Sequence, residues 1–134
     1  MTNFPLKIVT PDGLKFEGMA EEVIVRTTSG DLGIQAGHIN CVAPLGMGQA
    51  LFILDGKKRY GACIGGMVSV MNGQTTIVAT TFEWADEIDA QRAQQSEHKA
   101  RARLQDKTAS DTDIRLAEAR LKRALVRQGV ANLK

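Results

Sequence analysis

The residue composition changes sharply near residue 85, and this change limits what the chain can fold into more than any other feature. Residues 1–84 hold twelve of the 13 glycines, all three prolines and all six aromatic residues. Residues 85–134 hold one glycine and no aromatic residue. Aromatic residues favour strands, glycine and proline favour turns, and both turn residues disfavour helix interiors. We therefore expect a β-domain over residues 1–84 and a helical part over residues 85–134.

Turn signals divide residues 1–84 into short apolar runs. The strongest of these signals are Pro11-Asp12-Gly13, Asp55-Gly56 and Asn72-Gly73. Asp-Gly and Asn-Gly favour two-residue hairpin turns because both residues tolerate a positive φ. Short strands that recur roughly every 8–12 residues are typical of a sandwich or a barrel. The predicted fold class is α+β, with an N-terminal antiparallel β-sandwich followed by a C-terminal two-helix antiparallel hairpin.

Helix-start signals place two helices in residues 85–134. Asp86, with Asp89 three residues later, resembles an N-cap and its partner, and it predicts a first helix that runs to about Gln105. Ser110, with Asp113 three residues later, predicts the start of a second helix by the same rule. The connection between the two helices is short, so they should be antiparallel neighbours.

The seam between these helices should be thin. Residues 85–134 contain ten alanines and only nine larger aliphatic residues. Each alanine buried in place of leucine forgoes roughly 2 kcal/mol of transfer free energy. The small and apolar residues at helical spacing are Ala93, Ser96 and Ala100, then Ile114, Ala117, Leu121 and Ala124. We expect the second helix to end near Gln128, with Gly129 after its C-cap, and the hairpin to need one docking partner or more.

Charge and cysteine content argue against several classes of protein. The formal net charge is +2, so no broad nucleic-acid-binding surface is required. No apolar run of about 18 residues is present, and the N-terminal sequence lacks the pattern of a signal or transit peptide. Cys41 and Cys63 lack metal-site spacing. We expect both to be reduced, buried thiols, although the sequence leaves a disulfide between them open.

No catalytic or metal-binding motif is present. The glycine-rich segment 27–38 resembles a phosphate loop, but it lacks the lysine and does not lead from a strand into a helix. We expect a tight loop between strands, in which Gly30, Gly33 and Gly37 allow unusual φ values. His38 lacks a nearby Cys or Asp partner in the sequence, so a structural or interface role is favoured over a catalytic one.

Three arginines of the second helix share one face. Arg120, Arg123 and Arg127 follow a 3-4 spacing, which brings them together at about 100° per residue. A solvated basic face is the simpler interpretation. The alternative is a site for carboxylates or phosphates, because guanidinium groups bind both bidentately and three neighbouring cations repel one another without an anion.

Nearly the whole chain resembles the epsilon subunit of bacterial F-type ATP synthase. The resemblance rests on IVTPDGLKFEG, TTSGDLGIQAGHINCVAPLGMGQ, CIGGMVSV and TTIVATTFEWADEID, followed by the helical hairpin. It implies a non-catalytic rotor subunit at the cytoplasmic face of the bacterial cell membrane, in a proton- or sodium-driven ATP synthase. Its sandwich, residues 1–84, would bind the gamma subunit and the c-ring, and would touch the membrane only through the complex.

The resemblance also implies a regulatory hairpin at residues 85–134. In the family it folds on the sandwich or extends along gamma into the catalytic alpha/beta hexamer, where it inhibits ATP hydrolysis. Some members bind ATP in the folded form through an Ile/Leu-Asp-x-x-Arg-Ala motif and arginines of the second helix. The corresponding residues here are Glu83, Ile88, Asp89, Arg92, Ala93, Arg123 and Arg127. ATP would be a regulatory ligand, with no metal of the subunit's own, and Asp31 and His38 match the segment that faces gamma and the c-ring.

Two other functions are weighed against this one. The first is a rotor epsilon subunit of purely structural role that does not bind ATP. The second is a nucleic-acid-binding protein with a basic hairpin. The eight acidic residues of residues 85–134 and their lack of aromatic residues for base stacking argue against the second function.

Overall fold

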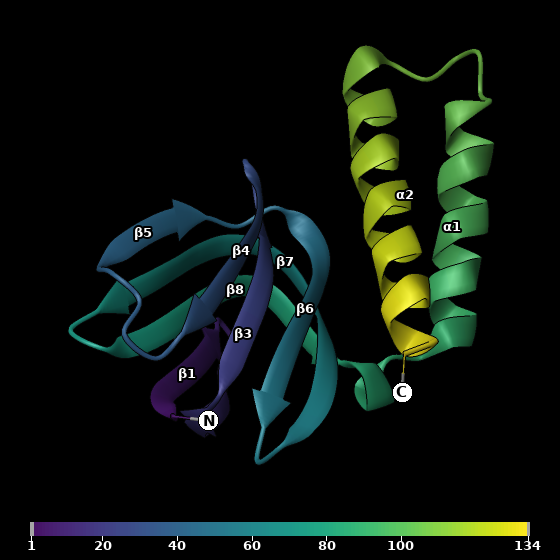
Figure 1. The fold of residues 1–134 in the computed structure, drawn as a ribbon. Coiled ribbons are helices and arrows are strands. Elements are labelled where there is room, and N and C mark those ends of the chain that lie inside the picture. Colours follow the sequence, from purple (N-terminus) through teal and green to yellow (C-terminus); the bar gives the residue numbers. More distant parts are fainter. Residues whose placement is uncertain (1, 134) are drawn as a thin grey trace.

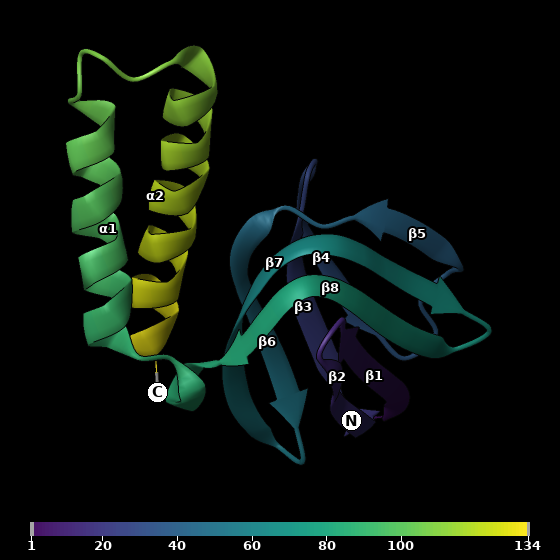
Figure 2. The same cartoon turned by 180° about the vertical axis from the view of Figure 1, so that it is seen from behind.

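The computed structural model describes residues 2–133, in which a curved β-sheet is followed by two helices that stand beside it (Figures 1 and 2). The strands are β1 (Phe4–Thr10), β2 (Gly13–Ala20), β3 (Glu22–Thr27), β4 (Gly30–Gln35), β5 (Cys41–Pro44), β6 (Met47–Leu54), β7 (Lys57–Met71) and β8 (Gln74–Trp84). A 3₁₀ turn, η1 (Ala85–Glu87), leads to the helices α1 (Ala90–Leu104) and α2 (Asp111–Ala131). The predicted fold class, a β-sandwich followed by a helical hairpin, is confirmed.

The sheet has the strand order β2-β1-β8-β7-β6-β3-β4, and β5 pairs with β7. Strand β1 runs parallel to β8, and the other pairs are antiparallel. The long strand β7 joins the two layers, because residues 57–64 pair with β6 and residues 67–70 pair with β5. The strand turns between these parts at Gly65 and Gly66, whose φ values are +70° and +102°. A Cβ at Gly66 would collide with the carbonyl oxygen of Val78, so the two backbones approach closely there.

Both predicted two-residue hairpin turns are confirmed. Asp55 and Gly56 join β6 to β7 with φ values of +53° and +74°. Asn72 and Gly73 join β7 to β8 with φ values of +52° and +82°. Positive φ at both central residues is the requirement of a type I′ turn, which matches the twist of the flanking strands.

The glycine-rich segment 27–38 differs from the expected loop. Its centre forms strand β4, which pairs with β3. Gly30 and Gly37 have positive φ values of +122° and +84°, but Gly33 lies within the strand and does not. The prediction of a loop was wrong because pairing with the β-branched residues of β3 overrides the weak strand preference of glycine.

The sandwich core ends in a cluster of aromatic side chains beside the hairpin. Trp84 packs edge-to-face against Phe82 and Phe52, with ring centroids 4.9 Å and 5.2 Å apart. The Arg59 guanidinium lies 3.8 Å from the centre of the Trp84 ring, a cation–π contact. This cluster fixes the end of β8, from which the hairpin starts.

The start of the first helix differs from the prediction. Asp86 lies in η1, and the true N-cap is Asp89, whose Oδ1 accepts a hydrogen bond from the Arg92 backbone N–H at 3.0 Å. Glu87 instead accepts from the Trp84 backbone N–H at 3.0 Å, which closes the 3₁₀ turn. The predicted start of the second helix is confirmed, because Ser110 and Asp113 form a reciprocal capping box.

The end of the second helix lies farther on than expected. Helix α2 continues through Gly129 to Ala131, and Asn132 is its C-cap. Val130 and Ala131 are buried against Ile88 in a small cluster at the foot of the hairpin. Burial of this last turn outweighs the roughly 1 kcal/mol that glycine costs inside a helix.

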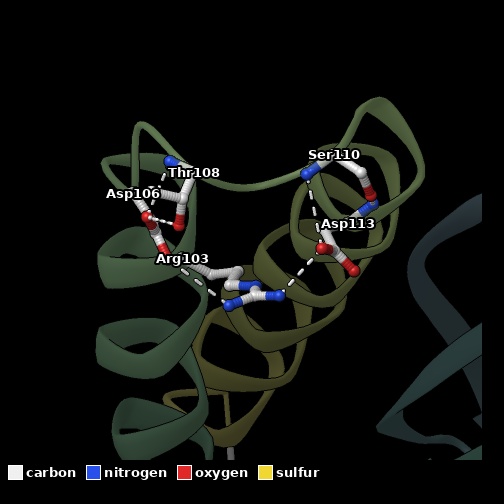
Figure 3. A network of polar contacts seen from close by, with 5 residues as sticks. All are labelled: Arg103, Asp106, Thr108, Ser110 and Asp113. Carbon is white, nitrogen blue, oxygen red and sulfur yellow. Dashed lines mark hydrogen bonds and ion pairs between the residues drawn. The ribbon is translucent and has the colours of Figure 1, made fainter.

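A polar network closes the tip of the hairpin (Figure 3). Arg103 on α1 donates to Asp113 on α2 at 2.8 Å and reaches Asp106 at 3.5 Å. The carboxylate of Asp106 accepts from the backbone N–H and the hydroxyl of Thr108 at 2.9 Å and 2.7 Å. The predicted short connection between antiparallel helices is therefore a defined turn.

The two cysteines are free. Cys63 is buried in the core, and burial raises the pKa of its thiol to about 12. Cys41 is only half-buried, so the expectation of burial was wrong for this residue. Its Sγ lies 3.9 Å from Nδ1 of His38, so the expectation that His38 has no Cys nearby was wrong.

Candidate functional site: a cationic cleft between sandwich and hairpin

A cleft of about 730 Å³ separates the sandwich from the hairpin. Its sandwich side is formed by Thr10, Asp12, Lys15, Ile64, Thr81, Phe82 and Glu83. Its hairpin side is formed by Ser96, Lys99, Ala100 and Arg103 of α1 and by Ala117, Arg120, Arg123, Ala124 and Arg127 of α2. Ligand sites of proteins typically occupy roughly 300–1,000 Å³, so the cleft has the size of a small-molecule site.

The hairpin seam opens onto this cleft. Four alanines are buried where the helices meet, Ala93 and Ala100 from α1 and Ala117 and Ala124 from α2. Alanine at these positions lets the helices approach closely and leaves space on the side that faces the sandwich. Longer side chains flank the alanines, so the walls of the cleft are polar although its floor is apolar.

Glu83 faces the hairpin because of strand alternation. Its neighbours Phe82 and Trp84 belong to the sandwich core, so the side chain between them points to the opposite face of β8. Glu83 forms a bidentate ion pair with Arg127 of α2, with Nε–Oε1 and Nη2–Oε2 distances of 2.7 Å and 3.2 Å. The two side chains are 32% and 21% exposed. The pair therefore fastens the hairpin to the last strand of the sandwich.

Positive charge dominates the cleft. Its lining includes six cationic side chains and two carboxylates, Asp12 and Glu83. Glu83 is paired with Arg127, and Arg103 is paired within the tip network. Among residues 2–133, no salt bridge involves any of the other four cations, which are Lys15, Lys99, Arg120 and Arg123. Such an excess of cations favours the binding of an anion with several charges.

The residues of the nucleotide motif are only partly brought together. Glu83, Arg123 and Arg127 line the cleft. The other four do not: Ile88 and Ala93 are buried, Asp89 caps α1, and Arg92 is exposed. Arg92 nevertheless lies on the cleft side of α1, because Arg92, Ser96, Lys99 and Arg103 follow one another at 4-3-4 spacing, and Asp89 caps the same helix one turn before Arg92.

Three cations of the cleft were not predicted. Lys99 and Arg103 lie on the same face of α1 as Arg92, so helical spacing could have identified them. Lys15 lies in the sandwich, 81 residues before Ser96, the first cleft-lining residue of the hairpin. No sequence pattern connects it to the site, and only the docking of the two parts brings it there.

Asp31 and His38 lie away from this cleft, near the two ends of β5. Asp31 pairs with Arg26 at 2.6 Å and follows the β3–β4 turn, where the Thr28 N–H donates to the Pro44 carbonyl at 3.1 Å. His38 is half-buried before β5, and its Nδ1 lies 2.8 Å from the Ile39 carbonyl oxygen. Strand β5 lies on the side of the sandwich that faces away from the hairpin (Figures 1 and 2).

An apolar patch lies on the same side as β5. Met67 and Val78 are cross-strand partners, Met71 is on the same face of β7, and Val42 is opposite Ser69 on β5. The four apolar side chains are between 43% and 59% exposed. Neighbouring exposed apolar residues of this kind mark protein interfaces.

In residues 2–133, no group of three or more His, Cys, Asp or Glu side chains is placed to hold a metal ion.

The fold and the cleft define a class of protein: a β-sandwich that carries a docked two-helix hairpin and holds a cationic site at the joint. Two family models match the chain, "ATP synthase, Delta/Epsilon chain, beta-sandwich domain" over residues 3–85 and "ATP synthase, Delta/Epsilon chain, long alpha-helix domain" over residues 86–132. The chain belongs to the ATP synthase delta/epsilon family.

Similar proteins agree with this assignment. The chain is 42% identical to the ATP synthase epsilon chain of Bacillus cytotoxicus, with both chains covered fully, and 44% identical to that of Bacillus velezensis, with 98% of each covered. A chain in a structure of the Euglena gracilis mitochondrial ATP synthase, "OSCP/F1/c-ring in rotational state 1", has the same fold, with a TM-score of 0.84 at 23% identity. That match covers all of this chain and 83% of the other.

Family membership makes the chain a non-catalytic subunit of the ATP synthase. The resemblance identified in the sequence is confirmed, as is the expectation that the protein is not an enzyme in its own right. Within residues 2–133, no helix combines the length and the apolar character needed to cross a membrane.

Proposed function

We propose that this subunit couples the c-ring to the gamma subunit through its sandwich and regulates ATP hydrolysis through its hairpin. The hairpin docks on the sandwich when ATP occupies the cleft. Without ATP it extends along gamma into the alpha/beta hexamer and inhibits hydrolysis. The observation that supports this proposal best is the cationic cleft, because its two walls belong to the two parts that would separate.

Two cleft-lining arginines of α2, one turn apart, are suited to the phosphates. Arg123 is exposed to the cleft, and no salt bridge within residues 2–133 uses it. Two nitrogen atoms of Arg127, Nε and Nη2, donate hydrogen bonds to Glu83. A guanidinium has five N–H donors, so Arg127 can hold Glu83 and a phosphate oxygen together. Glu83 then acts as the group that orients Arg127.

The base and ribose would lie toward the start of α1. Arg92 is one turn before Ser96, and Asp89 is one turn earlier. A rotamer change of the exposed Arg92 side chain is sufficient to bring its guanidinium over the cleft. Asp89 has a second carboxylate oxygen beside the one that caps the helix, and this oxygen can accept from the ligand. Ile88 and Ala93 act as packing residues that hold this turn in place.

Ligand binding would shift a nearly balanced equilibrium. Within residues 2–133, a small apolar cluster and one ion pair hold the docked hairpin on the sandwich. A ligand that binds only the docked form stabilises it by RT ln(1 + [L]/Kd), which is about 2.7 kcal/mol at 100 times Kd. A contribution of this size is sufficient to change which state is populated.

The opposite side of the sandwich suits the rotor partners. The apolar patch near β5 is available while the hairpin is docked, because it faces away from the hairpin. Asp31 and His38 border β5 and add polar contacts at its two ends. We propose that gamma and the c-ring bind here, which holds the subunit at the cytoplasmic face of the bacterial membrane in a proton- or sodium-driven synthase.

The nucleotide proposal is tested by titrating ATP into the full chain and measuring heat. Millimolar or tighter binding is expected, with loss of about tenfold or more in affinity for Arg123→Ala and for Arg127→Ala. Lys122→Ala is the matched control, because this exposed residue of α2 does not line the cleft. Absence of binding at millimolar ATP, or equal affinities for all four proteins, would leave a purely structural rotor subunit.

A further inference from the structure

Lys15 is presented to the cleft by an irregularity of strand β2. The pairing of β1 with β2 runs from Ile8–Phe16 directly to Val9–Leu14, which leaves Lys15 without a partner. An extra residue in one strand is a β-bulge, and bulges redirect side chains and occur often beside binding sites. Strand β2 is the edge of the sheet, so the redirected side chain can reach the hairpin without crossing another strand.

Within the described part of the chain, the charge of Lys15 has no partner of its own. The side chain is half-buried and lines the cleft, but within residues 2–133 it forms no salt bridge. On the same two strands, Lys7 is paired with Glu17 at 3.8 Å. Asp12 also lines the cleft but is not within ion-pairing distance of Lys15. The Lys15 side chain therefore has no counter-charge within residues 2–133 and is available to an anion in the cleft.

Across the cleft, the hairpin presents more positive charge. Lys99, Arg120 and Arg123 line the opposite walls, and none of them is in a salt bridge within the described chain. Cations that face one another from two parts of a protein oppose the docking of those parts. An anion between them reverses this effect. A chain of several phosphates offers oxygen atoms to the cations of both walls.

We propose that Lys15 contacts the phosphate chain of the ligand in the cleft, so that the ligand directly bridges the sandwich and the hairpin. The inference rests on the proposed binding of ATP and adds a residue from the sandwich to the site. Binding and docking are then one event, because the phosphate chain is held from both sides. A hairpin that leaves the sandwich loses Lys15 and with it part of its affinity for the ligand.

The test uses the full chain with Lys15→Gln, which removes the charge and nearly preserves the length of the side chain. Lys57→Gln is the control, since Lys57 is an exposed sandwich residue outside the cleft and its loss changes the net charge equally. The probes are ATP, inorganic tripolyphosphate and adenosine, each titrated calorimetrically at low salt. Trp84 fluorescence confirms that the variants are folded.

For Lys15→Gln we expect affinities about tenfold weaker for ATP and for tripolyphosphate, and an unchanged affinity for adenosine. Lys57→Gln should stay within about twofold of the natural protein. Equal ATP affinities for Lys15→Gln and Lys57→Gln overturn the bridge and leave the ATP proposal intact. If tripolyphosphate binds and ATP does not, and Lys15→Gln weakens the binding of tripolyphosphate, then Lys15 contacts a phosphate chain as proposed, but the ligand is not ATP. Absence of binding by every probe overturns both.

Discussion

Single residues determine how the two layers of the sandwich meet and where the hairpin begins. Gly66 lies where β7 passes from one layer to the other, with φ of +102° and the carbonyl oxygen of Val78 where a Cβ would lie. Gly129 differs in both respects, because it is helical and has no other atom within 4 Å of an added Cβ. The same residue type is thus required at one position and costly at the other.

These two glycines give opposite predictions for alanine. Gly66→Ala should lower the free energy of unfolding by about 2–4 kcal/mol, because the new methyl group collides with backbone and φ is unfavourable. Gly129→Ala should raise hairpin stability by about 0.5–1 kcal/mol, because alanine has the higher helix propensity. Urea unfolding followed by Trp84 fluorescence and by circular dichroism at 222 nm measures both. A Gly66→Ala protein as stable as the natural one contradicts the close approach.

Turns and helix caps were predictable from the sequence where only one assignment was compatible with the local residues. Asn72-Gly73 and Ser110 with Asp113 were correctly assigned from the sequence, because turn and cap chemistry depend on neighbours in the chain. The start of α1 was not, because Asp86 and Asp89 both have the chemistry of an N-cap. Glu87 decides between them by closing the upstream 3₁₀ turn, which a spacing rule does not foresee.

At the scale of elements, the helix pair is held by a narrow seam and a polar tip. The seam is built from alanines, which allow close approach but bury little area. The foot is fixed by Ile88, Val130 and Ala131, and the tip by the network around Arg103. The sequence indicated the seam from its spacing. It did not indicate β5, a strand of four residues that forms by pairing with β7, far away in the sequence.

Overfilling the seam should separate the helices. Ala124→Leu adds three carbon atoms at a buried position between α1 and α2 and should destabilise the hairpin by about 1–3 kcal/mol. Ala102→Leu is the control, because Ala102 is exposed on α1, and its effect should stay within about 0.5 kcal/mol. Thermal unfolding at 222 nm compares the two variants. A hairpin that accepts leucine at 124 as readily as at 102 would mean that the seam is loosely packed.

The hairpin should lose stability in acid. Ser110 lowers the pKa of Asp113 through backbone and side-chain hydrogen bonds, Thr108 does the same for Asp106, and Gln128 and Arg101 lower the pKa of Glu97. A depressed pKa in the folded state means stability that is present above the unfolded pKa, near 4, and is lost as pH falls further.

The measurement is helix content by circular dichroism at 222 nm between pH 7 and pH 3. Helicity should hold down to about pH 5 and then fall, as the three carboxylates become protonated. Asp113→Asn should be less helical at pH 7 and change less on acidification, because the capping box is already weakened. Helicity that rises in acid contradicts the direction of these pKa shifts.

At the scale of the whole molecule, the site exists only because two parts dock. Glu83 at the end of β8, Lys15 in a bulge of β2 and the arginines of α2 form one cleft. The helical part of this cleft was partly predictable, since Arg120, Arg123 and Arg127 share a helix face. The sandwich wall was predictable only for Glu83, through family resemblance. The position of Lys15 depends on the docking geometry, which no local pattern of the chain encodes.

The central claim is that the hairpin undocks and that ATP holds it on the sandwich. Amide hydrogen exchange of the full chain, with and without ATP at about 100 times its Kd, tests this most directly. The amides of α1 and α2 should exchange up to about 100-fold more slowly with ATP, and those of the sandwich core should change little. At the same ATP concentration, Arg123→Ala should reduce the slowing of the hairpin amides to about tenfold or less. Hairpin exchange that is the same with and without saturating ATP would contradict the account.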